Sequence, residues 1–270
     1  MARQKGHIKY IGTLGEVRHF KMKSLPGFFA GMKGGPTGEQ VLNDTVFERT
    51  RENMNEFGGC ALVGKAIRVG LAQLMKQMSD PQVTGRLTAI MKKINLEDQS
   101  EARGYHAILI TSQPQYLIGF AFDRKTSFDS IFYAPLNLVA AADRTSATLT
   151  VPAFTPLNLM DAPSGATHFR LINAVSVVSD YEYNDQSKVY EPVDSELNEL
   201  SDIEYSDYLS LTDAISTDTV ITATLPGSPT IAKGSGVSVL NSIGIEFYQQ
   251  VGTNYYLFNS GNALKIQAIF

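Results

Sequence analysis

Two hydrophobic periods divide this chain of 270 residues. Between residues 45 and 95, apolar side chains recur at steps of three and four, which is the period of an amphipathic helix. From His106 onward, apolar and polar residues alternate, which is the period of a strand with one buried face. The change of period predicts a helical segment followed by a β-rich segment, and therefore an α+β fold.

The helical segment carries recognisable start and break signals. Thr45 and Glu48 stand three residues apart, as in a capping box, so a first helix is expected to begin there. The pair Gly58-Gly59 is expected to weaken or bend it, because glycine is a poor helix former. Leu62 opens the apolar face expected for the next helix. The predicted helices cover residues 46–57, 62–78 and 83–94.

The predicted strands lie on both sides of the helices. The alternating start of the chain, with Gly12 and Gly15 in its middle, predicts an N-terminal β-hairpin. The glycine-rich segment 26–36 is expected to be a loop or an extended arm, which packs on its own domain or adds a strand to a neighbour. The second half is expected to form an antiparallel β-sandwich. Its candidate strands are 106–111, 116–122, 128–133, 136–141, 146–152, 168–178, 219–225, 236–247, 254–258 and 263–270.

Charge divides the chain near the same place. Residues 1–105 hold 16 Lys and Arg against 10 Asp and Glu, a net charge of +6, and residues 106–270 hold 7 against 17, a net charge of −10. We therefore expect a basic domain over 1–105, with hairpin, arm and helices, and an acidic sandwich domain over 106–270. Much of the acidic excess falls at about 179–213, which is expected to be a long surface insertion.

The residues that usually carry catalysis give weak signals. The four histidines are scattered, the single cysteine, Cys60, follows a glycine pair at the start of an apolar face, and no phosphate-binding loop is present. The acidic insertion could attract calcium, but it lacks the glycine and glutamate spacing of an EF-hand loop. The sequence therefore predicts no enzyme and no cofactor, while a catalytic site dispersed over loops stays open.

Short motifs suggest one relationship. The segments 47–58 and 166–170, the opening residues 2–6 and the turn 33–35 resemble a family of uncharacterised proteins from Bacteroidota. The resemblance implies a bacterial origin, and it implies no activity and no catalytic residue.

Opposite charges on the two halves favour a structural subunit that assembles head to tail with copies of itself, as a filament, tube or particle component. The alternative is a sandwich module that binds a carbohydrate or peptide through the tyrosines of the insertion. Glu48, Glu52 and Glu56 share one helix stripe, beside Arg49 and Arg51, which predicts an exposed salt-bridged face or a docking face. The residues expected at the assembly interface are Arg3, Lys5, Lys9, Arg18, Lys21, Lys23, Phe28, Phe29, Arg49, Arg51, Asp194, Glu196, Glu199, Asp202, Glu204 and Asp207.

Partners and location follow from the same composition. The expected partners are copies of the chain itself and other particle or surface components. A net charge of −4 argues against a nucleic-acid module, although the basic N-terminal residues could follow phosphates. No apolar run reaches the length of a membrane span. The start of the chain lacks the apolar core of a signal peptide, so the protein is expected in the cytoplasm at synthesis, with export by another route left open.

Overall fold

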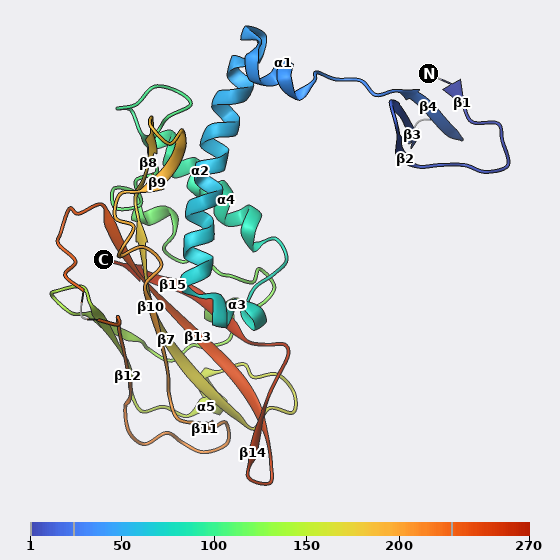
Figure 1. Ribbon diagram of the computed structural model, residues 1–270. Helices are drawn as coiled ribbons and strands as arrows, with labels where there is room; N and C mark the ends of the chain where they lie inside the picture. Colours follow the sequence, from blue (N-terminus) through green and yellow to red (C-terminus); the bar gives the residue numbers. More distant parts are fainter. Residues whose placement is uncertain (1, 24, 228) are drawn as a thin grey trace. The chain divides into compact units, whose positions relative to one another are not determined.

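The computed structural model describes residues 2–23, 25–227 and 229–270. By internal contacts the chain forms two compact units, residues 1–51 and residues 52–270 (Figure 1). The contact boundary therefore lies between Arg51 and Glu52, whereas the charge pattern places a boundary near residue 105. The α+β class predicted from the sequence is confirmed.

The first unit is a small antiparallel sheet followed by short helices. Its four strands have the order β1-β4-β3-β2. The segment 26–36, expected to be a loop or arm, instead contains the strand β4, which pairs with both β1 and β3. The predicted hairpin exists, but its first strand is the glycine-containing segment itself. The elements are β1 (Ala2–Arg3), β2 (Gly12–Leu14), β3 (Val17–Lys21), β4 (Phe28–Met32), α1 (Gly38–Asn43) and the 3₁₀ turn η1 (Thr45–Phe47).

The capping box lies eight residues earlier than predicted. The Thr37 side chain accepts the Gln40 N–H, and the Gln40 side chain reaches back to the Thr37 N–H, so this box begins α1. Thr45, where the box was expected, begins the 3₁₀ turn instead, and that turn has no side-chain cap. The sequence T-x-x-Q at Thr37 carries the same capping chemistry as T-x-x-E.

Three helices precede the main sheets. They are α2 (Glu48–Gly70), α3 (Ala72–Met78) and α4 (Val83–Glu97). The bend expected at Gly58-Gly59 is absent, because α2 continues through both glycines. The break comes at Leu71, whose backbone leaves the helical region before α3 begins. The helical content of the sequence is thus predicted correctly, while the point of interruption is not.

The main sheet is built on two long strands, β7 (His168–Ser179) and β13 (Val237–Val251). They pair antiparallel from His168 opposite Tyr248 to Ser179 opposite Val237. The shorter strands β10 (Ser201–Tyr205) and β11 (Leu209–Ser210) pair with β7, while β14 (Asn254–Leu257) and β15 (Ala263–Ile269) pair with β13.

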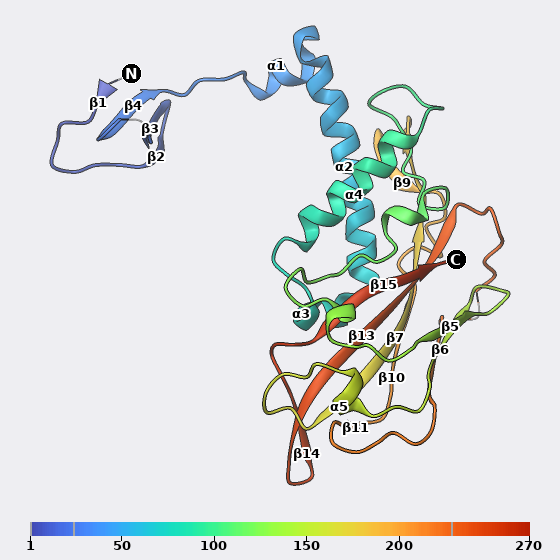
Figure 2. The same ribbon diagram turned by 180° about the vertical axis from the view of Figure 1, so that it is seen from behind.

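A second antiparallel sheet covers one face of the main sheet. It consists of β5 (Asn137–Ala140), β6 (Ser146–Val151) and β12 (Thr219–Thr224) in the order β12-β6-β5. The helices α2, α3 and α4 cover the other face (Figures 1 and 2). Alternate residues of β7 serve the two layers: Phe169 and Leu171 face the second sheet, and Ile172 and Ala174 face the helices. The remaining elements are β8 (Tyr181–Asn184), β9 (Val189–Pro192), α5 (Pro156–Leu159) and the 3₁₀ turns η2 (Pro114–Tyr116) and η3 (Phe128–Ser130).

Three predicted strands are wrong. Segments 106–111, 116–122 and 128–133 form irregular chain and 3₁₀ turns, with only isolated bridges such as Ile108 to Tyr181. Their apolar residues are nonetheless buried: Ile110, Phe122 and Phe128 lie in the core. Apolar and polar residues alternate in these segments because the apolar side chains anchor the chain in the core, not because the backbone pairs in a sheet. The strands predicted from residue 136 onward are confirmed, with small shifts of their ends.

The segment 179–213 is not the surface excursion that its acidity predicts. It contains β10, which pairs with the central strand β7, and the hairpin of β8 and β9. Tyr181 and Tyr190 from this segment are buried in the same core as the helices. Asp180 of this segment is 2% exposed and accepts the Thr111 N–H at 3.0 Å, so even part of its acidity belongs to the interior.

Candidate functional site

The sheet of residues 2–32 has charged side chains over its aromatic rings. Phe20 and Phe29 lie opposite each other on β3 and β4, with ring centroids 6.3 Å apart. The guanidinium carbon of Arg18 lies 5.8 Å from the Phe20 centroid, and Lys21 Nζ lies 4.5 Å from the Phe28 centroid. Cation–π contacts of this kind contribute about 0.5–1 kcal/mol at exposed sites.

This unit buries almost no apolar surface. Among the described residues up to Arg51, Phe29 is the one hydrophobic side chain that is buried, at 9% exposure. Large hydrophobic side chains that would normally form a core stand in solvent instead. They are Ile8 at 72%, Tyr10 at 54%, Ile11 at 69%, Leu14 at 71%, Leu25 at 47%, Met32 at 76%, Leu42 at 65% and Val46 at 84% exposure.

The loop that carries Ile8 and Ile11 is nevertheless fixed. The Gln4 side chain donates to the carbonyls of Tyr10, at 3.3 Å, and Phe29, at 3.1 Å, and its oxygen accepts the Tyr10 N–H at 3.0 Å. One amide thus ties both ends of the loop to β4. The exposed apolar residues therefore sit on a defined backbone.

The basic residues expected at an interface all lie in this unit. Arg3, Lys5, Lys9, Arg18, Lys21 and Lys23 are exposed, and within residues 2–23, 25–227 and 229–270 none of them pairs with a carboxylate. The predicted aromatic pair differs in exposure, since Phe28 is half-buried and Phe29 is buried.

The two helix arginines behave differently. Arg49 is exposed. Arg51 donates to the carbonyls of Val41, at 2.9 Å, and Asp44, at 2.8 Å, and so holds the end of α1. Its guanidinium already has partners inside its own unit.

The acidic residues expected at an interface lie between β9 and β11. Asp194 accepts the N–H groups of Glu196 and Leu197 and shapes a turn, and Asp202 accepts the Thr224 N–H at 2.8 Å. Glu199 is half-buried with a φ of 73°. Glu196, Glu204 and Asp207 are exposed. The structure thus separates carboxylates that shape the chain from carboxylates that face solvent.

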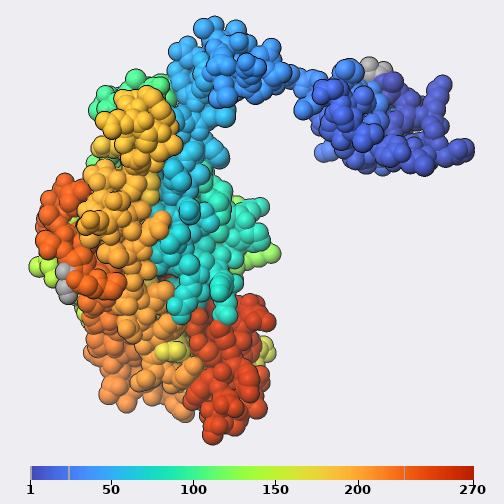
Figure 3. Space-filling model, in the orientation of Figure 1, coloured from blue at the N-terminus to red at the C-terminus, as the bar shows by residue number. Residues whose placement is uncertain are grey.

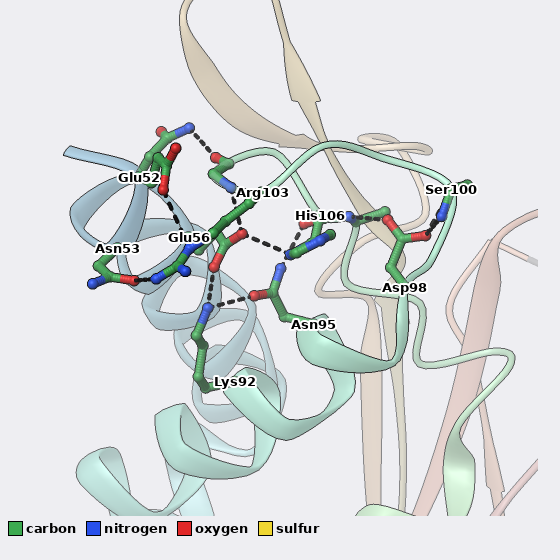
Figure 4. A network of polar contacts seen from close by, with 12 residues as sticks. Glu52, Asn53, Glu56, Lys92, Asn95, Asp98, Ser100, Arg103 and His106 are labelled. Carbon is green, nitrogen blue, oxygen red and sulfur yellow. Dashed lines mark hydrogen bonds and ion pairs between the residues drawn. The ribbon is translucent and has the colours of Figure 1, made fainter. Parts of the chain in front are cut away.

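A buried carboxylate, Glu56, forms the centre of a polar network that the sequence did not indicate (Figure 4). Its side chain is 2% exposed. It binds Lys92 of α4, accepts the Gly104 N–H at 2.7 Å and lies 2.8 Å from His106 Nδ1. The predicted exposed stripe of Glu48, Glu52 and Glu56 is therefore wrong at Glu56, because this side of the helix faces the chain 98–107.

The network joins α2, α4 and the connection between α4 and the sheet. Asn95 donates to the His106 carbonyl at 2.6 Å, and the Tyr190 hydroxyl donates to the same carbonyl at 2.9 Å. Burial alone would raise the pKa of Glu56, but Lys92, the Gly104 N–H and His106 hold it below its usual value. A carboxylate whose oxygens are occupied in this way serves as a structural anchor and is poorly placed to accept a proton from a substrate.

Cys60 lies one turn after Glu56 and is fully buried. Burial raises the pKa of its thiol to about 12, with Glu56 adding to the rise. The reactive thiolate is therefore scarce at neutral pH. Among the described residues, no group of three or more His, Cys, Asp or Glu side chains could hold a metal ion.

The tyrosines of the 179–213 segment form two sets. Tyr181 and Tyr190 are buried, and Tyr183 packs edge-on against Tyr105, at 4.8 Å, and against Tyr190. The second set belongs to a row of stacked groups in which Arg170 lies over Tyr205 and Tyr208.

That row continues on β14. Tyr208 stacks on Tyr255 at 3.9 Å, and His168 meets Tyr255 edge-on. Packing among the rings and Arg170 accounts for the arrangement. Tyr208 keeps 39% exposure within this row.

No family model matches the chain, and no curated protein or solved structure matches it significantly. In the part of the chain that the structure describes, no helix is long and apolar enough to cross a membrane.

Proposed function

We propose that this protein is a structural subunit that assembles with copies of itself through its first unit, residues 1–51. The proposal rests on the exposure of apolar side chains in that unit. Eight large hydrophobic side chains are exposed, and among its described hydrophobic residues Phe29 alone is buried. A unit of this size is marginal even with a proper core, and such units usually gain stability from oligomerisation. A neighbouring copy of the chain that covers the sheet buries these exposed side chains and so provides the hydrophobic core that the unit lacks.

Charge supports a head-to-tail contact. The first unit holds nine Lys and Arg against four Asp and Glu, a net charge of +5, and the rest of the chain holds 14 against 23, a net charge of −9. Two first units therefore repel each other, while a first unit and a second unit attract. Contacts between different surfaces of identical chains produce rings or open filaments. The edge strands β1 and β2 also leave backbone groups for pairing with a neighbour.

The test is the mass of the full-length protein by light scattering, with electron microscopy of the same sample, at low and high salt. Regular particles are expected, and they should shrink at high salt because the contact joins opposite charges. A variant lacking residues 2–35 should remain folded, since the second unit keeps the other buried hydrophobic residues, and it should be a monomer. A full-length chain that is monomeric at both salt concentrations contradicts the proposal.

Three matched single variants separate the contact from general solubility. Leu14→Ser and Met32→Ser remove exposed apolar side chains from the first unit, at 71% and 76% exposure. Leu157→Ser removes one from α5 at 68% exposure. We expect the first two changes to weaken assembly and the third to leave it unchanged.

A further inference from the structure

The chain that leads from α4 toward the main sheet is irregular, and side chains hold it in place. We name residues 98–107 the strap. Its own backbone contributes the turn in which the Tyr105 N–H donates to the Ala102 carbonyl at 3.0 Å. In Figure 3 the green surface near residue 100 lies against the yellow tip of the hairpin of β8 and β9. The position of the strap therefore depends on the groups that bind it.

Two buried carboxylates bind the strap (Figure 4). Asp98, which is 8% exposed, accepts the Ser100 N–H at 2.9 Å and the Ala107 N–H at 2.7 Å. Glu56 of α2 accepts the Gly104 N–H at 2.7 Å. Hydrogen bonds to an ionised oxygen are roughly twice as strong as bonds between neutral groups. The strap is thus held by the charge of two side chains.

Titratable groups from several elements surround Glu56. They are Lys92 of α4, Arg103 and His106 of the strap, Glu52 and Cys60 of α2 and Tyr190 of β9. His106 and Tyr190 also face Asp98. In acid the imidazole of His106 carries a positive charge, as Lys92 does. Protonation of Glu56 therefore leaves two like charges around a neutral acid, and their repulsion favours opening of the strap.

The buried carboxylates elsewhere in the fold respond to acid in the opposite way. Among the described residues the buried carboxylates are Glu56, Asp98, Asp180 and Glu246. Burial acts to raise the pKa of each, and it does raise the pKa of Asp180 and Glu246. For Glu56 and Asp98 the hydrogen bonds and positive charges outweigh burial, so both pKa values lie below the ordinary ones of 4.5 and 3.8.

The sign of each shift decides what acid does. A lowered folded pKa gives a contribution to stability that is present above the unfolded pKa and is lost as the pH falls through the folded value. The contribution of Glu56 therefore begins to fall near pH 4.5, and that of Asp98 near pH 3.8. A raised folded pKa has the reverse effect, so acid relieves the cost of burying Asp180 and Glu246. Acid thus weakens the strap before the sheets.

We infer that acid releases the strap, which stays closed on α2 while Glu56 and Asp98 are ionised and opens, with the sheets still folded, once both carry a proton. Ser100, Tyr105 and Ala107 of the strap form one wall of a cavity of about 490 Å³, and β8 forms the other. Opening of the strap dismantles this cavity. The inference is independent of self-assembly, because all the groups involved lie in the second unit.

Hydrogen–deuterium exchange of the full-length protein tests the release directly. The amide protons of Ser100, Gly104 and Ala107 are the ones donated to the two carboxylates. Between pH 6 and pH 3 their protection, measured against an unstructured peptide at the same pH, should fall about tenfold or more as charged acceptors become neutral. The amides of β7 and β13 should stay protected. Loss of protection in strap and sheet together, or a strap still protected at pH 3, overturns the inference.

Two amide variants imitate the protonated carboxylates at pH 7. Glu56→Gln should release the amide of Gly104 and leave that of Ala107 protected, and Asp98→Asn should do the reverse. The matched control is Glu101→Gln on the same strap, because this side chain is exposed and, within the described chain, makes no hydrogen bond or ion pair. Protection of β7 and β13 shows that each variant is folded. Folded variants with unchanged exchange in the strap would contradict the inference.

The pH at which the strap opens identifies the trigger. Lys92→Gln removes the cation that helps to keep Glu56 ionised, so the midpoint of opening should move up by about one pH unit or more. Its control is Lys93→Gln, whose side chain is exposed and, among the described residues, has no hydrogen bond or ion pair. This control should leave the midpoint unchanged. A midpoint that also stays unchanged in Lys92→Gln would show that Glu56 does not hold the strap through its charge.

Discussion

The ring of Tyr190 packs directly on the backbone of Gly59. A Cβ built at Gly59 would stand 2.5 Å from Cγ of that ring, closer than non-bonded carbon atoms approach. Tyr190 is 3% exposed, and its hydroxyl donates to the His106 carbonyl. The glycine therefore lets the hairpin of β8 and β9 pack against α2 and contributes to the wall of the buried polar network.

Gly59→Ala should destabilise the protein by about 1–3 kcal/mol, because the added methyl group displaces a buried ring. The control is its neighbour Gly58, where a Cβ meets nothing within 4 Å. Gly58→Ala should stabilise the protein by roughly 0.5–1 kcal/mol, as expected for glycine in a helix interior. Urea unfolding of both variants measures the difference, and equal effects would contradict the packing described.

These adjacent glycines show how far the sequence determines the fold. Periodicity correctly predicted the helices, the strands from residue 136 onward and the α+β class, because local burial patterns follow each element's period. It could not tell that Gly59 provides room for Tyr190, since that contact joins residues 131 positions apart. From the sequence alone, the pair predicts a bend that α2 does not have.

The polar network around Glu56 could not be predicted from the sequence for a similar reason. Glu56 meets Lys92, Gly104 and His106 through tertiary packing, and no sequence spacing joins them. The exposure of Met54, Phe57 and Leu62 on α2 could have been found, because a helix that turns one apolar face to the core turns its other side to solvent. The exposure of the basic residues of the first unit follows from their type, because Lys and Arg are almost never fully buried unless paired.

Glu56→Gln should lower the free energy of unfolding by about 1.5–3 kcal/mol at pH 7, because it weakens hydrogen bonds to a charged acceptor. Folding lowers the pKa of Glu56, so the ionised group stabilises the fold above its unfolded pKa, near 4.5. That contribution is lost as the pH falls through the lower folded value. The difference in the free energy of unfolding between the variant and the unchanged protein should therefore shrink below pH 4.5. Unfolding curves measured from pH 3 to pH 7 will show this. A difference independent of pH would mean that the carboxylate is not ionised in the fold.

Cys60 should resist thiol reagents in the folded protein. Burial and a thiol pKa raised to about 12 leave little accessible thiolate at pH 8. Reaction with Ellman's reagent should be at least about 100-fold slower in the native protein than in urea, where one thiol per chain reacts. The matched control places a cysteine on the surface, as Val139→Cys with Cys60→Ala, and should react at once. Rapid native labelling of Cys60 would show that the core around α2 opens readily.

Glu246 should show the opposite pH dependence from Glu56. Burial raises its pKa, although the Tyr248 hydroxyl and the positive charge of Arg170 partly offset the rise. A raised folded pKa gives a contribution that is complete below the unfolded pKa and lost as the pH rises through the folded value. Glu246→Gln keeps an acceptor for the Tyr248 hydroxyl and removes the buried charge.

We therefore expect this variant to be more stable than the unchanged protein at pH 7, by roughly 1 kcal/mol, with the advantage vanishing toward pH 4. Thermal unfolding across that range measures it. A variant that is less stable at pH 7 would show that attraction between Glu246 and Arg170, which face each other across β7 and β13, outweighs the cost of burial.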